Sequence, residues 1–140
     1  MRFAICVARF YEELADRLVA GATKALPEDA EVDTFEVPGA FELPLAAKLA
    51  AASGRYDAVI CLGAVIRGET SHYDYVCGES ARGIQDVQLE TGVPCSFGVL
   101  TVDNYEQALA RSGEGKRDSG AHAAEAVLAL IAVKQKLAQA

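Results

Sequence analysis

Residues 63–72 combine glycines, hydroxyls and a histidine in the string Gly-Ala-Val-Ile-Arg-Gly-Glu-Thr-Ser-His, which follows an apolar run and opens a predicted helix. At a helix start, backbone N–H groups and the hydroxyls of Thr70 and Ser71 lie where the macrodipole is positive, which predicts a phosphate site. The string lacks the Gly-Lys-Ser/Thr of a Walker A loop and the spacing of a GxGxxG motif. The alternative is an ordinary N-cap by Thr70 or Ser71 after a glycine turn.

His72, one of two histidines in the chain, closes this string at the mouth of a strand-to-helix junction. A histidine in that place can transfer protons near neutral pH, which predicts a general acid or base. The alternative is a histidine that only bonds a neighbouring side chain at the helix start. His122 lies near the start of the last predicted helix, and we interpret it as a solvated surface residue.

Residues 37–44, Val-Pro-Gly-Ala-Phe-Glu-Leu-Pro, place two prolines, a glycine and an aromatic ring at the end of another strand. Proline fixes the turn, Gly39 lets the backbone approach a ligand closely, and Phe41 can stack on a planar ring. The alternative is a rigid turn above a core phenylalanine. The same two interpretations apply to Phe10 and Phe97, where core packing is favoured.

Arg111 ends a short predicted helix and precedes Ser112-Gly113. A cation is stabilised at a helix C-terminus without any ligand, and composition favours this interpretation. Beside an anion site, the planar guanidinium would instead bind a phosphate through paired hydrogen bonds. The sequence leaves both interpretations open.

Three short runs that are apolar on both faces predict buried parallel strands at residues 3–8, 58–62 and 94–100. Residues 31–37 alternate with one slip in phase, which predicts an edge or near-edge strand. Helical periodicity between the strands predicts helices at residues 12–26, 41–52, 72–89, 105–111 and 121–138. This alternation is typical of a doubly wound α/β sheet, in which ligands bind at the carboxyl ends of the strands.

The chain has 140 residues, of which 51% are hydrophobic, and a net charge of −7. This length predicts one domain over residues 1–140. The acidic balance and a longest basic run of only Lys116-Arg117 argue against nucleic acid or an anionic membrane as partner. Because no apolar run reaches the ~20 residues that span a bilayer and no signal peptide is recognisable, we expect a soluble cytoplasmic protein.

The cysteines are widely spaced and contain no CxxC pair, and three of them lie in apolar runs: Cys6, Cys61, Cys77 and Cys95. This spacing favours buried thiols over disulfides or a zinc site.

Three strings, at residues 37–44, 63–77 and 97–108, together with Arg9-Phe10, resemble the lumazine synthase family in order and spacing. The resemblance covers nearly the whole chain. It implies a flavodoxin-like three-layer α/β sandwich, a four-stranded parallel sheet with helices on both faces. It also implies an enzyme of riboflavin biosynthesis that converts 5-amino-6-(D-ribitylamino)uracil and 3,4-dihydroxy-2-butanone 4-phosphate into 6,7-dimethyl-8-ribityllumazine and phosphate. No metal or redox cofactor is implied.

The resemblance implies roles residue by residue, with His72 as the proton-transfer residue. The uracil substrate is bound by groups from three junctions: Phe10, which stacks on the pyrimidine, Gly39, Ala40, Phe41 and Glu42 along the ribityl chain, and Val65 and Ile66 at the uracil edge. The phosphate is bound by the backbone N–H groups of Glu69 and Thr70 and by Arg111. Phe97 and Arg111 come from the neighbouring subunit, because family members form pentamers or sixty-subunit shells of twelve pentamers.

The chain departs from the family in two places. Where the family usually has Lys-Gly before the last helix, this sequence reads Ser119-Gly120, with cations shifted back to Lys116 and Arg117. A second cation at the phosphate is therefore in question. The chain also starts almost on its first strand and lacks the N-terminal segment that, in many family members, adds a strand to the sheet of a neighbouring subunit. We therefore expect pentamers, or pairs of pentamers, rather than a closed shell.

Other functions stay open on the sequence: a paralogous riboflavin synthase acting on two lumazine molecules, a non-catalytic flavin or lumazine carrier, and a structural shell protein. His72 and Arg111 favour an enzyme over the last two. Imine formation, loss of phosphate and ring closure each need proton transfer and orientation rather than a nucleophile, which fits these residues.

Overall fold

A four-stranded parallel sheet forms the centre of the computed structural model, which describes residues 1–113 and 117–139. The strand order is β2-β1-β3-β4. The strands are β1 (Arg2–Ala8), β2 (Glu31–Val37), β3 (Ala58–Ile66) and β4 (Cys95–Val102). The predicted edge position of residues 31–37 is confirmed, because β2 pairs with β1 and its residues are half-buried or exposed.

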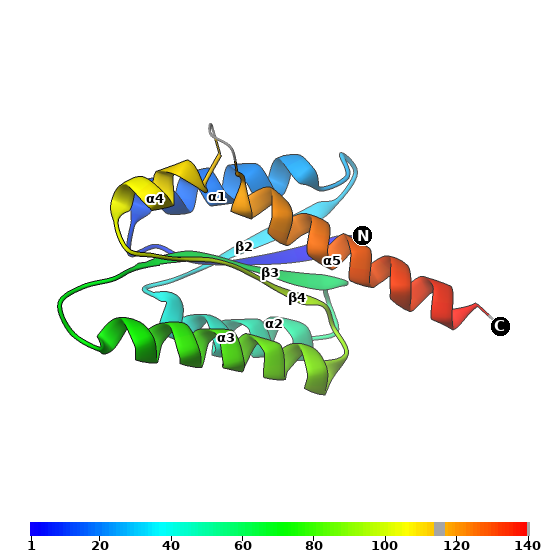
Figure 1. Ribbon diagram of the computed structural model, residues 1–140. Helices are drawn as coiled ribbons and strands as arrows, with labels where there is room; N and C mark the ends of the chain where they lie inside the picture. The colour runs from blue at the N-terminus through cyan, green and yellow to red at the C-terminus, as the bar shows by residue number, and fades with distance from the viewer. Residues whose placement is uncertain (114–116, 140) are drawn as a thin grey trace.

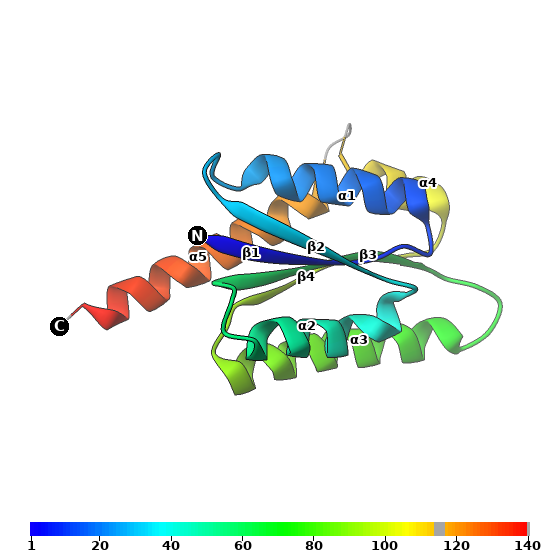
Figure 2. The ribbon, with the colours of Figure 1, turned by 180° about the vertical axis from the view of Figure 1, so that it is seen from behind.

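Helices cover both faces of the sheet, which confirms the three-layer sandwich (Figure 1). One face carries α1 (Glu12–Ala25), α4 (Tyr105–Ala110) and α5 (Ser119–Ala138). The other carries the 3₁₀ turn η1 (Ala40–Glu42), α2 (Leu43–Ala52) and α3 (His72–Thr91), as the view from behind also shows (Figure 2).

Two hydrophobic clusters lie on the two faces of the sheet, and β1 contributes to both. Its larger side chains, Phe3, Ile5 and Val7, pack with α1 and α5. Its smaller side chains, Ala4, Cys6 and Ala8, pack toward the alanine-rich helix α2. Burial on both faces explains why this strand is an uninterrupted apolar run in the sequence.

Strand β3 ends at Ile66, four residues later than predicted, so the prediction that Gly63 begins a turn is wrong. Gly63 pairs with Val99 of β4 inside the sheet. A Cβ added at Gly63 would lie 2.9 Å from the Cβ of Ala8, which is closer than real Cβ atoms approach. The glycine therefore serves contact between β3 and β1, and the turn that leads to α3 comprises residues 67–71.

The helix boundaries differ slightly from the predicted ones. The segment predicted as one helix over residues 41–52 begins as η1 before α2. Helix α3 runs on to Thr91 and ends at Gly92, whose φ of 71° suits glycine. Helix α5 begins at Ser119, two residues early, because the Asp118 side chain accepts a hydrogen bond from the Ala121 N–H at 3.0 Å.

All four cysteines are free, and the prediction of buried thiols holds for Cys6, Cys61 and Cys95, whereas Cys77 is half-buried. Burial raises the pKa of the Cys95 thiol to about 12, so this thiol is protonated and unreactive at neutral pH. Over residues 1–113 and 117–139, no cluster of acidic, histidine and cysteine side chains has the arrangement of a metal site.

Gly120 lets α5 pack closely on α1. A Cβ at Gly120 would overlap the carbonyl oxygen of Leu18, a backbone atom that cannot move aside alone. We expect Gly120→Ala to lower the free energy of unfolding by about 1–3 kcal/mol, measured by urea or thermal unfolding. Gly78→Ala is the control, because nothing lies within 4 Å of a Cβ there in helix α3. Equal stability of the two variants would contradict this packing role.

Candidate active site

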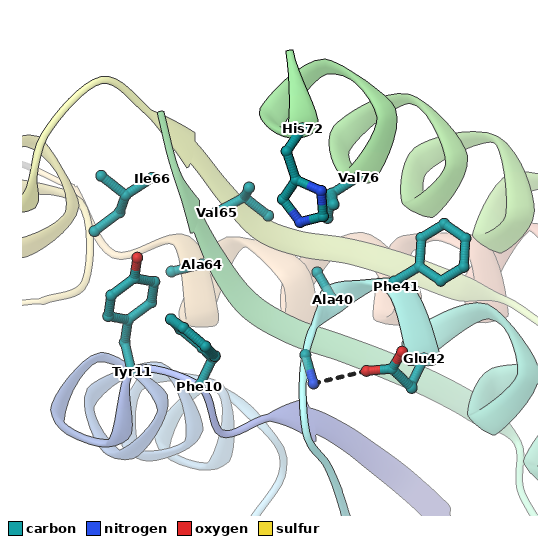
Figure 3. A pocket seen from close by; sticks show the side chains of 11 residues that line it. Phe10, Tyr11, Ala40, Phe41, Glu42, Ala64, Val65, Ile66, His72 and Val76 are labelled. Atoms are coloured by element: carbon teal, nitrogen blue, oxygen red, sulfur yellow. Dashed lines mark hydrogen bonds between the residues drawn. The ribbon is translucent and has the colours of Figure 1, made fainter. Parts of the chain in front are cut away.

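An open cavity of about 530 Å³ lies at the carboxyl ends of β1, β2 and β3 (Figure 3). Its lining comes from the turns after β1 and β2, the last residues of β3 and the start of α3. The lining residues are Phe10, Tyr11, Gly39, Ala40, Phe41, Glu42, Ala64, Val65, Ile66, His72 and Val76. This is the place where parallel α/β sheets bind ligands, and the volume suits a small molecule.

The cavity brings together eight of the predicted site residues: Phe10, Gly39, Ala40, Phe41, Glu42, Val65, Ile66 and His72. Glu69, Thr70, Phe97 and Arg111 do not line it. Sequence reasoning missed Tyr11, Ala64 and Val76. Each had a signal in hindsight: Tyr11 follows Phe10, Ala64 precedes Val65, and Val76 lies one helical turn after His72.

Phe10 is 73% exposed, so the favoured prediction that it packs in the core is wrong. Its ring contacts Tyr11 edge-on, with ring centroids 4.9 Å apart. Tyr11 in turn lies 6.3 Å from the ring of Tyr105 in α4. Aromatic side chains thus form the wall of the cavity next to α1 and leave the Phe10 face accessible.

Arg9 fixes the turn that carries Phe10. Its guanidinium pairs with Asp16 at 2.8 Å and with Glu36 at 3.2 Å, which joins α1 to the end of β2. The backbone N–H of Arg9 also donates to the backbone carbonyl of Val37 at 2.9 Å. The two strand ends on this side of the cavity are therefore held at a set distance.

The turn after β2 is fixed by hydrogen bonds at both of its ends. The Gly39 N–H donates to Glu42 Oε1 at 2.9 Å (Figure 3). The Ser80 hydroxyl of α3 donates to the Ala40 carbonyl at 3.0 Å. Phe41 is 57% exposed, so the alternative of a core phenylalanine is wrong. An exposed carboxylate with one oxygen held by the backbone is well placed to accept hydrogen bonds from the hydroxyls of a polyol.

The turn between β3 and α3, residues 67–71, is held by Arg67. Its side chain donates to Asp103 Oδ1 at 2.9 Å, and its guanidinium lies 4.2 Å from the ring centroid of Tyr73. The hydrogen bond to Asp103 raises the pKa of Arg67, which stays charged. Arg67 thus ties the first turn of α3 to the end of β4.

Glu69 and Thr70 are exposed at the N-terminus of the 20-residue helix α3, where a phosphate is favoured. The predicted alternative was an N-cap by Thr70 or Ser71, and Ser71 does occupy the N-cap position, although its side chain makes no cap hydrogen bond. The Thr70 hydroxyl instead accepts a hydrogen bond from the His72 N–H at 3.3 Å.

His72 is the first residue of α3 and points its imidazole into the cavity (Figure 3). Its side chain is exposed and belongs to neither hydrophobic cluster. The titratable side chains among the lining residues are Tyr11, Glu42 and His72, and the rest of the lining is mostly apolar. A bound substrate would therefore find one imidazole within an apolar wall. His122, by contrast, is exposed on α5, as predicted.

Phe97 and Arg111 lie outside the cavity of their own chain. Phe97 is 40% exposed on the edge strand β4, so the favoured prediction that it packs in the core is wrong. Arg111 follows α4, and its Nη1 donates to the carbonyl of Gln107 at 3.0 Å, which is the helix-terminus role that the sequence favoured. Within the described part of one chain, neither side chain completes the site.

The fold and cavity define a class of protein: a three-layer α/β domain with a cavity of small-molecule size at its strand ends and a histidine in the cavity wall. A family model described as 6,7-dimethyl-8-ribityllumazine synthase matches residues 1–135. The chain therefore belongs to the 6,7-dimethyl-8-ribityllumazine synthase family, which places it among transferases of riboflavin biosynthesis. None of the helices over residues 1–113 and 117–139 combines the length and apolar character needed to cross a bilayer.

Proposed function

We propose that this chain condenses 5-amino-6-(D-ribitylamino)uracil with 3,4-dihydroxy-2-butanone 4-phosphate to give 6,7-dimethyl-8-ribityllumazine and phosphate, as a cytoplasmic enzyme without metal or redox cofactor. The observation that carries the proposal is the meeting of Phe10, residues 39–42, residues 65–66 and His72 around one cavity in a member of this family.

The cavity supports a role for each wall. The exposed ring of Phe10 stacks on the pyrimidine, and Val65 and Ile66 border the uracil edge. The wall for the ribityl chain is formed by Gly39, Ala40, Phe41 and Glu42. The Glu42 carboxylate accepts hydrogen bonds from the hydroxyls of this chain. The volume of about 530 Å³ lies in the ordinary range for such ligands.

The reaction needs proton transfer at several steps, and His72 is placed to supply it. The amine of the uracil substrate adds to the butanone carbonyl, and loss of water gives an imine. Phosphate then leaves by elimination, and the enol that remains becomes a ketone. The ribityl-bearing nitrogen adds to this second carbonyl, and loss of a second water closes the ring. Each step moves a proton to or from nitrogen or oxygen, so one imidazole that alternates between its two forms serves them all.

The phosphate binds beside this centre, at the N–H groups of Glu69 and Thr70 and at Arg111 of an adjacent subunit. The start of α3 supplies positive potential, and a guanidinium supplies a bidentate partner. Phe97 of the adjacent subunit also contributes to the site in this proposal.

The test is to mix the purified protein with both substrates and follow the lumazine chromophore. Product formation that requires both substrates supports the proposal. Lumazine consumed without the butanone phosphate, with riboflavin formed, would identify a riboflavin synthase. Tight lumazine binding without turnover would identify a carrier. Assembly without affinity for either small molecule would identify a shell protein.

Phe10→Ala is expected to raise the KM for the ribitylaminouracil by roughly three- to tenfold, because an aromatic stacking contact is lost. Thermal stability should stay unchanged, since the ring is 73% exposed. Phe10→Tyr keeps the ring and should restore the KM. Steady-state kinetics that show no difference between the two variants would contradict stacking at this position.

We also propose that the chain forms a homopentamer or a pentamer-based assembly with active sites between subunits. Large apolar side chains exposed on several helices support an assembly: Leu45, Leu49, Tyr75, Leu89, Val133 and Leu137. Light scattering should give a mass that is a multiple of five chains of 14.8 kDa. A monomer or a dimer at assay concentration would contradict the proposal.

A further inference from the structure

Arg17, in the middle of α1, reaches the end of α4 more than ninety residues further along the chain. Its Nε donates to the Ser112 hydroxyl at 2.9 Å. Its Nη2 donates to the carbonyls of Leu109 at 3.2 Å and Gly113 at 3.0 Å. One half-buried guanidinium thus spans the turn that follows α4.

The end of α4 explains why a guanidinium belongs there. Carbonyls in the last turn of a helix lack partners within the helix and carry the negative end of its dipole. Ser112, only 1% exposed, shares this task, because its hydroxyl also donates to the Leu109 carbonyl at 3.2 Å. The planar fork of an arginine can bind a hydroxyl and two carbonyls in one geometry, which the single ammonium of a lysine cannot reproduce.

Arg111 lies inside this turn. The backbone N–H of Arg111 donates to the Ala108 carbonyl at 3.2 Å, and the Arg111 carbonyl accepts a hydrogen bond from the Ser119 backbone N–H at 2.8 Å. Arg17 binds residues on both sides of it, at Leu109 and at Gly113. The place of Arg111 relative to α1 is therefore set by Arg17 as well as by α4.

We propose that Arg17 is a positioning residue for Arg111: it fixes the turn from which the Arg111 guanidinium is presented to the phosphate of the butanone substrate. This inference rests on the proposed function, in which Arg111 serves the site of an adjacent subunit. In this proposal Arg17 acts through the turn it binds and not on the substrate itself, so its effect passes through Arg111.

The test is steady-state kinetics of Arg17→Met in the assembled enzyme. Methionine keeps much of the stem and removes the donors. The KM for the butanone phosphate should rise about three- to tenfold, because a displaced guanidinium binds the anion less well, while the KM for the ribitylaminouracil stays within about twofold. Arg17→Lys should recover only part of the loss. Lys24→Met is the control, because it removes an exposed cation from the same helix. It should change neither the KM for the butanone phosphate nor the KM for the ribitylaminouracil.

The double variant Arg17→Met with Arg111→Ala separates positioning from direct binding. If Arg17 acts through Arg111, the double variant has the same KM for the butanone phosphate as Arg111→Ala alone, within about twofold. Multiplicative effects would mean that Arg17 binds the phosphate itself, and would overturn the proposal. So would a fall in thermal stability of Arg17→Met with both KM values unchanged.

Failure of the proposed function has a different signature. If Arg111→Ala itself leaves the KM for the butanone phosphate unchanged, Arg111 has no phosphate role and nothing remains for Arg17 to position. If Arg111→Ala raises that KM and Arg17→Met does not, only the positioning role is lost. Should Arg17→Met fail to fold, Arg17→Lys and Ser112→Ala carry the test, with the same selective rise in KM expected on a smaller scale.

Discussion

His72→Ala is expected to lower kcat by about ten- to a thousandfold, because it removes the imidazole to which the proposed function assigns proton transfer while leaving the cavity walls in place. The side chain is exposed at the first position of α3 and belongs to neither hydrophobic cluster. Substrate affinity, assembly and thermal stability should therefore change little. We expect the lower part of this range, since amine and ketone substrates condense appreciably without a catalyst.

The matched control is His122→Ala, which removes the other histidine of the chain from an exposed position on α5. This variant should keep full turnover. Rates are to be measured at saturating concentrations of both substrates, so that a change in kcat is not confused with a change in KM. A loss of less than twofold in His72→Ala would remove His72 from the proton-transfer role.

The sheet was predictable from the sequence because burial on both faces leaves continuous apolar runs, and an edge strand leaves an imperfect alternation. The end of β3 was not. Glycine is common in turns, but at Gly63 the lack of a side chain instead allows close contact with Ala8 of the neighbouring strand. Local pattern cannot distinguish a glycine that ends a strand from one that lets two strands approach.

The cavity was predictable to the extent that topology brings strand ends together. Residues that follow β1, β2 and β3 meet because parallel strands end at the same edge of the sheet. The exposure of individual side chains was less predictable: phenylalanine is usually buried, but Phe10 and Phe41 lie at the surface. Arg17 shows a second limit, because its partners lie far away in sequence and only tertiary packing brings them near.

Arg111→Ala is expected to raise the KM for the butanone phosphate by about ten- to a hundredfold and to leave the KM for the ribitylaminouracil almost unchanged. The reason is electrostatic. The phosphate carries nearly two negative charges, and a charge-assisted hydrogen bond to it is worth roughly 1.5–3 kcal/mol. The uracil substrate has no such group, so it loses nothing when the guanidinium is removed.

Arg117→Ala decides whether another cation shares this duty. The resemblance to the family predicts a lysine at the position of Ser119. The Ser119 N–H is bonded to the Arg111 carbonyl, so this uncharged position lies directly beside Arg111. Arg117 is exposed near the start of α5, whereas Lys116 lies outside the described residues.

Equal rises in KM for the butanone phosphate in Arg111→Ala and Arg117→Ala would mean that Arg111 and Arg117 share the anion. A rise in Arg111→Ala alone would mean that Arg111 and the N-terminus of α3 bind it without Arg117. An unchanged KM in Arg111→Ala would exclude Arg111 from the site.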